Sequence, residues 1–276
     1  MQASTQTVIE FLTEMVEAGL GYSSVNSAKA AVCAFLSTCS DPTNHSTSPL
    51  LARFMKGVFN YKPVIPKASF TWDVSVLLKH LAKLSPPKAL NLITLSAKLA
   101  TLLLLLSGQR GQSIYLLNLE DVEVNPNNLI LRFSELLKQS KPGRHLDEVM
   151  IPAYPEERLC VVATFKEYIK RTAGLRKSKT GKLFIVTKKP HQSASRDTLS
   201  RWIKWQMRLA GIDMSRFASH SVRSASTSAA CAGKVPLPII LRTAGWSKED
   251  TFRKFYKKPI GRQEEFAQSI LSLHKK

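Results

Sequence analysis

The chain lacks the sequence features of a membrane protein, a zinc protein or a disulfide-stabilised protein. Its leucine run, Leu102–Leu106, is far shorter than the roughly 20 apolar residues that a membrane-spanning helix needs. We therefore expect no membrane partner. No pair of cysteines has the Cys-x-x-Cys spacing typical of zinc sites. Because Cys33, Cys39, Cys160 and Cys231 have apolar or small neighbours, we expect buried free thiols in a reducing compartment.

Acidic residues are scarce. The sequence has 20 Asp and Glu against 40 Lys and Arg, which gives a formal net charge of +20. The basic residues are spread along the chain, which favours a folded basic surface over a disordered arm. Such a surplus indicates a polyanionic partner, because each Lys or Arg near a phosphate releases condensed counterions. We predict nucleic-acid binding, with a basic structural protein of ribosomal or nucleosomal type as the alternative.

Carboxylates are also too dispersed to predict a metal site. The pairs Asp147-Glu148 and Glu249-Asp250 are adjacent in sequence and do not form a cluster suited to Mg²⁺. We therefore expect neither a metal nor another cofactor.

Hydrophobic periodicity predicts a mainly α fold with a small antiparallel β-sheet. A small helical N-terminal domain is expected over residues 1–65, and a larger mixed domain over residues 66–276. Between them, residues 61–69 carry two prolines and two lysines and are typical of a linker. In the larger domain we expect helices at 72–84, 89–106, 159–172, 199–207, 219–232 and 237–244, and strands at 129–133, 149–151 and 183–186.

Three short patterns carry the candidate chemistry. Ser107-Gly-Gln-Arg110 follows an apolar helix, His220-Ser-Val-Arg223 opens a helix of small residues, and Gly245-Trp246 precedes Tyr256 by ten residues, counted from the tryptophan. Each has an ordinary structural reading on its own. The first is a helix C-cap with a solvated arginine, the second an exposed helical pair, and the third a set of core aromatics.

Taken together and in this order, the patterns resemble the catalytic domain of the tyrosine recombinases, the family of the phage integrases and the Xer and Cre enzymes. That family carries Arg, a β-hairpin Lys, His-x-x-Arg, His or Trp, and Tyr. The matching residues here are Arg110, His220, Arg223, Trp246 and Tyr256. The hairpin lysine is Lys138 or Lys141, and both remain open. The gap from Trp246 to Tyr256 is one residue longer than is common in bacterial members, and a loop extension of one residue can absorb it.

The resemblance implies an enzyme that cuts and rejoins DNA through a 3′-phosphotyrosyl intermediate. Two arginines would hold the phosphate oxygens, the histidine would act as acid or base on the tyrosine hydroxyl, and the lysine would protonate the departing 5′-oxygen. The tryptophan N–H would add a phosphate contact. The N-terminal domain would be the helical core-binding domain, which clamps DNA from the opposite side. The expected partners are double-stranded DNA and further copies of the chain, from dimer to tetramer.

The phrases around the motifs are more specific. Lys-Pro-Gly-Arg-His at 141–145 and Ala-Gly-Trp-Ser at 244–247 resemble the eukaryotic branch found in DIRS- and Crypton-type mobile elements. This implies a nuclear location in a eukaryote, and otherwise a cytoplasmic one on DNA.

Two alternatives share the fold. One is a type IB topoisomerase, which relaxes supercoils with the same catalytic set. The other is a domesticated relative that binds DNA without cutting it. An apolar stripe near the C-terminus is formed by Phe266, Ile270, Leu271 and Leu273. It would either dock on a neighbouring subunit or pack against its own chain.

Overall fold

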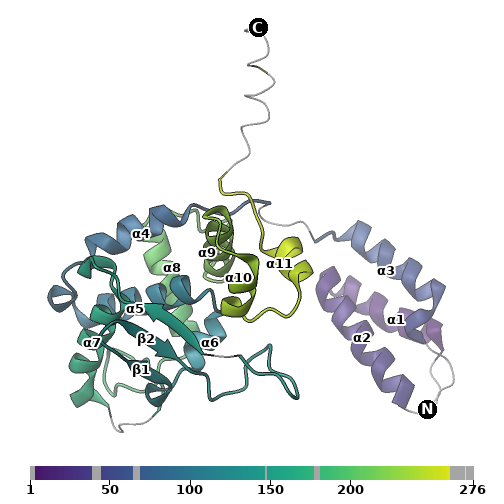
Figure 1. The fold of residues 1–276 in the computed structure, drawn as a ribbon. Helices are drawn as coiled ribbons and strands as arrows, with labels where there is room; N and C mark the ends of the chain where they lie inside the picture. The colour runs from purple at the N-terminus through teal and green to yellow at the C-terminus, as the bar shows by residue number, and fades with distance from the viewer. Residues whose placement is uncertain are drawn as a thin grey trace. The chain divides into compact units, whose positions relative to one another are not determined.

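The computed structural model describes residues 4–38, 45–64, 69–146, 148–176, 181–261 and 271. The chain divides into two units, Met1–Lys67 and Ala68–Lys276 (Figure 1). This division lies two residues beyond the one expected from the linker composition. The assignment of the first unit to DNA binding stays a prediction.

The first unit is built from three helices: α1 (Thr5–Glu17), α2 (Tyr22–Thr38) and α3 (Pro49–Tyr61). Ser4 and Ser48 cap α1 and α3 by accepting hydrogen bonds from backbone N–H groups in the first turn. The apolar faces of the three helices meet in one small core, formed by Val8, Leu12, Val25, Cys33, Leu36, Leu51, Met55 and Val58.

The second unit is organised around α5 (Leu92–Ser107). Most side chains of this helix are buried, as expected for a helix that is largely apolar all round. It contacts several neighbouring helices, chiefly α7 (Val161–Thr172), α8 (Arg196–Leu209) and α9 (Ser221–Ala232). The remaining helices are α4 (Val74–Lys83), α6 (Gly111–Leu116), α10 (Leu237–Ala244) and α11 (Glu249–Phe255). No described helix is long and apolar enough to cross a membrane.

A three-stranded antiparallel sheet in the order β1-β2-β3 lies in the same unit. Its strands are β1 (Val122–Val124), β2 (Asn128–Leu131) and β3 (Val149–Pro152), with Leu131 paired to Val122 and Val149. A long loop, residues 132–148, joins β2 to β3. We call residues 137–146 the hairpin loop, since both candidate lysines lie there. The prediction of a mainly helical fold with a small antiparallel sheet is confirmed.

Some expectations were wrong in detail. Residues 183–185 are buried but form no named strand; Ile185 makes an isolated β-bridge with Ser193. Cys33 and Cys160 are buried free thiols as expected, whereas Cys231 is only half-buried. Leu271 is 73% exposed. The residues of earlier interest that lie outside the described ones are Cys39, Asp147, Phe266, Ile270 and Leu273.

Candidate active site

Arg110 stands at a junction between two helices. Helix α5 ends at Gly108, whose φ of +59° is the left-handed conformation that glycine adopts at little cost. The chain then turns, and Arg110 caps the N-terminus of α6 with an extended backbone. Between them, the buried Gln109 donates a hydrogen bond from Nε2 to the carbonyl of Thr243 in α10. This contact ties the Arg110 turn to the end of α10.

Arg223 lies in the first turn of α9 and is only 3% exposed. Its Nη2 donates to the carbonyl oxygen of Ala244 at 2.8 Å, at the C-terminal end of α10, where the helix dipole is negative. Its Nε and Nη1 are buried and have no acceptor among the described residues. Burial and the positive charge of Arg110 lower the pKa of Arg223 to about 9, against the opposing influence of Tyr256.

Trp246 follows the helix cap at Gly245, where φ is +71°. The indole is buried, and the guanidinium carbon of Arg223 lies 4.2 Å from its ring centroid. Its centroid also lies 4.5 Å from that of Tyr256 and 5.5 Å from that of Phe252. Its Nε1 is a further buried donor without an acceptor among the described residues. Trp246 thus packs against one cation and two aromatic rings.

Tyr256 caps the end of α11 and is half-buried. Its carbonyl oxygen accepts hydrogen bonds from the hydroxyls of Ser228, at 2.6 Å, and Ser224, at 3.5 Å. Ser228 Oγ also accepts from the backbone N–H of Lys258 at 3.1 Å. Both serines lie on α9, the helix of Arg223. The main chain of the candidate nucleophile is therefore attached to the helix that carries the second candidate arginine.

The other candidate residues have fewer contacts with this group of side chains. His220 is exposed and immediately precedes α9, one helical turn before Arg223. Lys138 and Lys141 are exposed in the hairpin loop, and neither side chain contacts the other candidates among the described residues. The structure thus gathers Arg110, Arg223, Trp246 and Tyr256, keeps His220 nearby on the same helix, and leaves the two lysines on a surface loop.

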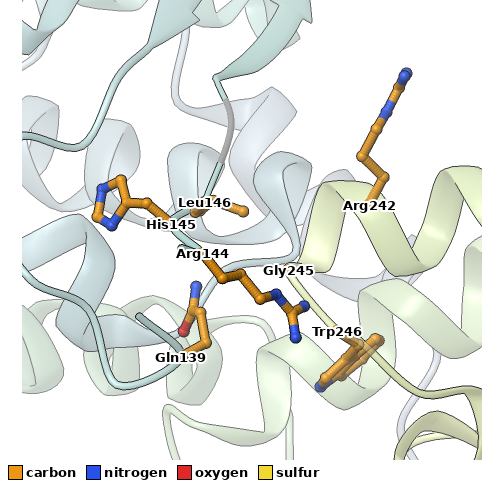
Figure 2. A pocket seen from close by; sticks show the side chains of 7 residues that line it. All are labelled: Gln139, Arg144, His145, Leu146, Arg242, Gly245 and Trp246. Carbon is orange, nitrogen blue, oxygen red and sulfur yellow. The ribbon is translucent and has the colours of Figure 1, made fainter. Parts of the chain in front are cut away.

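Three residues of this site escaped the sequence motifs: Gln139, Ser224 and Ser228. Gln139 Oε1 accepts a hydrogen bond from Arg110 Nη1 at 2.6 Å. Together with other hairpin-loop residues it lines a pocket of about 190 Å³ against Gly245 and Trp246 (Figure 2). The sequence gives a weak indication of the two serines, because they lie four residues apart on the small-residue helix that has Arg223 in its first turn. The sequence gives no indication of Gln139, because its contact with Arg110 depends on where the fold places the hairpin loop.

The site is therefore rich in positive charge and in donors that lack acceptors. Buried polar groups are nearly always hydrogen-bonded, so unpartnered donors mark a place where a ligand completes the bonding. Two guanidinium groups beside an indole N–H and a phenol can bind an oxyanion and hold it against a nucleophilic oxygen.

Several solved structures share the fold of this chain. The XerH site-specific recombinase bound to its difH substrate superimposes with a TM-score of 0.65 and 17% identity, over 98% of this chain and 70% of that one. The Tn1549 transposon integrase in complex with transposon right end DNA gives 0.63 and 16%, over 100% and 86%. A lambda integrase dimer bound to a COC′ core site gives 0.57 and 17%, over 95% and 82%. At these identities the likeness establishes the fold.

The family assignment comes from the sequence. No curated protein matches it. The family model described as the phage integrase family matches residues 74–259, which contain every candidate site residue and more than half of the chain. With this match and this fold, the chain belongs to the phage integrase family, the tyrosine recombinases.

Proposed function

We propose that this protein cleaves and rejoins DNA strands through a covalent link between Tyr256 and a 3′-phosphate. One observation carries the proposal. Three buried donor atoms, Nε and Nη1 of Arg223 and Nε1 of Trp246, find no acceptor within the described part of the chain and lie beside the ring of Tyr256. A phosphodiester placed there would supply the missing acceptor oxygens and bring its phosphorus to the phenol oxygen.

The step is an in-line exchange at phosphorus. The Oη–P bond forms as Tyr256 attacks, and the P–O5′ bond breaks. The two arginines stabilise the charge that builds on the non-bridging oxygens, and a preorganised donor of this kind is worth roughly 3 kcal/mol when removed. Because the phosphotyrosyl ester keeps the bond energy, attack by another 5′-hydroxyl reseals the DNA without a nucleotide cofactor. The residues provide for this chemistry without a metal.

Proton transfers are assigned to the more exposed candidates. His220 serves as acid or base for the Tyr256 hydroxyl, since it precedes Arg223 by one turn of the same helix. For the departing 5′-oxygen we favour Lys138 over Lys141. Lys138 directly precedes Gln139, whose side chain reaches Arg110.

The finer parts of the proposal rest on the relatives and on composition. The net charge of +20 fits a double-stranded DNA partner. The relatives include a dimer and a tetramer assembled on DNA, which supports a homo-oligomer here. One relative is a transposon integrase, in keeping with a mobile-element origin and the DIRS- or Crypton-like phrases. We place the protein on DNA, in the nucleus if the source is a eukaryote.

The test is capture of the covalent adduct. The protein is incubated with a pool of nicked duplexes, randomised around the cleavable phosphate, in which cleavage releases a short fragment and traps the adduct on a denaturing gel. We expect an adduct from the natural chain and none from Tyr256→Phe. The control Tyr154→Phe removes an exposed phenol elsewhere and should leave the adduct unchanged.

Other outcomes have defined meanings. Failure of the natural chain to trap any duplex would support a protein that only binds DNA. An adduct that persists in Tyr256→Phe would refute the nucleophile assignment. Relaxation of supercoiled plasmid without strand exchange between two captured duplexes would indicate topoisomerase-like action.

A further inference from the structure

Gln139 connects the hairpin loop to Arg110. Its Oε1 lies 2.6 Å from Arg110 Nη1. A guanidinium only donates hydrogen bonds, so this contact fixes which end of the carboxamide faces the arginine. The contact joins a loop after β2 to the turn between α5 and α6, two segments that are distant in sequence.

The other end of the carboxamide lies close to the backbone of Gly245. Gln139 Nε2 is buried and has no acceptor among the described residues. It borders the pocket that Arg144, Gly245 and Trp246 also line, and Figure 2 shows the Arg144 side chain extending toward Trp246. A ligand atom that accepts a hydrogen bond from Gln139 Nε2 would complete the bonding of this amide.

The backbone opposite is shaped to admit this side chain. Gly245 has no side chain, and a Cβ placed on it would lie 3.0 Å from Gln139 Nε2 and 2.9 Å from Leu146 Cδ1. A Cβ at this position would force the ends of the Leu146 and Gln139 side chains to shift. Gly245 thus serves two purposes, the left-handed turn that ends α10 and the close approach of the loop.

The chemistry of the carboxamide suits the support of an arginine that must remain charged. Arginine has many rotamers, and a fixed acceptor at one nitrogen directs the remaining N–H groups of the fork. A carboxylate would hold it more tightly but would cancel the charge needed by the phosphate. A neutral amide orients the guanidinium and leaves its charge free.

We infer that Gln139 is a positioning residue for Arg110. It fixes the guanidinium toward the cleaved phosphate and couples the hairpin loop to that phosphate. The inference rests on the proposed function, in which Arg110 stabilises charge on the non-bridging oxygens.

The first test uses a duplex captured in the adduct assay and the same duplex with a methylphosphonate at the cleaved position. The methyl group removes one negative charge, so an arginine that neutralises this charge becomes less important. We expect Gln139→Ala to slow adduct formation roughly 10- to 100-fold on the phosphodiester. This range is typical of the loss of a residue that orients a catalytic side chain. On the methylphosphonate the loss should shrink to less than about threefold.

Two further variants sharpen the result. Gln139→Glu keeps an acceptor for Arg110 but adds a negative charge, so it should slow cleavage of the phosphodiester at least as much as Gln139→Ala. Gln192→Ala removes an exposed glutamine elsewhere and should match the natural chain. Equal losses on both duplexes would indicate a merely structural role and overturn the inference, as would natural rates in Gln139→Ala.

A second measurement does not depend on cleavage. Sulfate that binds at the two arginines stabilises the folded chain and raises its thermal unfolding temperature. This rise should be reduced in Gln139→Ala and Gln139→Glu but kept in Gln192→Ala. If the natural chain forms no adduct, the proposed function fails, and this measurement still decides the inference. Equal sulfate effects in all four proteins would overturn it.

Discussion

Two serine hydroxyls hold the main chain of the proposed nucleophile, Tyr256. Ser224 and Ser228 both donate to the carbonyl oxygen of Tyr256, and Ser228 also accepts from the next segment of chain. Because reaction rates fall steeply when reacting atoms are misplaced by about 1 Å, these bonds matter more for chemistry than for stability.

Replacement of Ser228 by alanine should therefore separate the two effects. We expect a loss of about 2 kcal/mol in the free energy of unfolding, typical of two hydrogen bonds, with adduct formation slowed roughly 10- to 100-fold at saturating DNA. Ser226→Ala is the matched control, since Ser226 lies on the same helix and donates only to the Arg223 carbonyl. Equal cleavage rates in the two variants would show that the serine does not position Tyr256.

At the scale of elements, the end of α10 holds the site together. Its Ala244 carbonyl accepts from Arg223, its Thr243 carbonyl accepts from Gln109, and its Gly245 cap admits the hairpin loop. One helix terminus thus contacts the segments that carry Arg110 and Arg223 and the hairpin loop that carries the two candidate lysines.

Gly245→Ala tests this arrangement against a control with the same backbone demand. An alanine at φ of +71° should cost about 1 to 2 kcal/mol in unfolding free energy. Gly211→Ala should cost about the same, since Gly211 has φ of +84°, yet its Cβ would meet nothing within 4 Å. Only Gly245→Ala should also slow adduct formation, through displacement of Leu146 and Gln139. Denaturant unfolding and the adduct assay measure the two effects, and equal cleavage in both variants would contradict them.

The sequence could predict the long elements and the motif residues, because these depend on local patterns. The apolar stretch of α5 and the Gly108 cap that precedes Arg110 are evident from spacing alone. β1 is only three residues long and α6 only six, too short for a periodic signal. Residues 183–186 have strand composition, but whether such a segment pairs is decided by its neighbours. Gln139 was unpredictable for the same reason, because only the fold brings it to Arg110.

At the scale of the whole molecule, a buried lysine makes the stability of the fold depend on pH. Lys98 on α5 is fully buried, and its Nζ donates to the carbonyl oxygens of Leu84 at 2.6 Å and Arg158 at 2.7 Å. Burial lowers its pKa from 10.5 to about 8, with a weaker opposing influence from Glu157. The folded protein therefore releases this proton at lower pH than the unfolded chain.

The sign of the pH effect follows from this order. Below pH 8 Lys98 is protonated in both the folded and the unfolded chain, so the free energy of unfolding is lowered by the full cost of burying its charge. Between pH 8 and 10.5 the unfolded chain binds more protons, so the Lys98 contribution to stability rises with pH. We expect the unfolding free energy of the natural chain, relative to Lys98→Met, to be larger at pH 10 than at pH 7. Urea titrations of both proteins measure this difference, and a constant or falling value would contradict it.

The attachment of Tyr256 to α9 has a consequence for an assembly of several subunits. Because serines of the same chain hold Tyr256 beside Arg223, we expect each subunit to supply its own Tyr256 to the site that contains its own Arg223. In a mixed assembly, a chain with Tyr256→Phe could not borrow the missing phenol from a neighbour with Arg223→Ala. Two such defective chains would not complement each other, and the number of strands that an assembly cuts would equal the number of its intact subunits engaged on DNA.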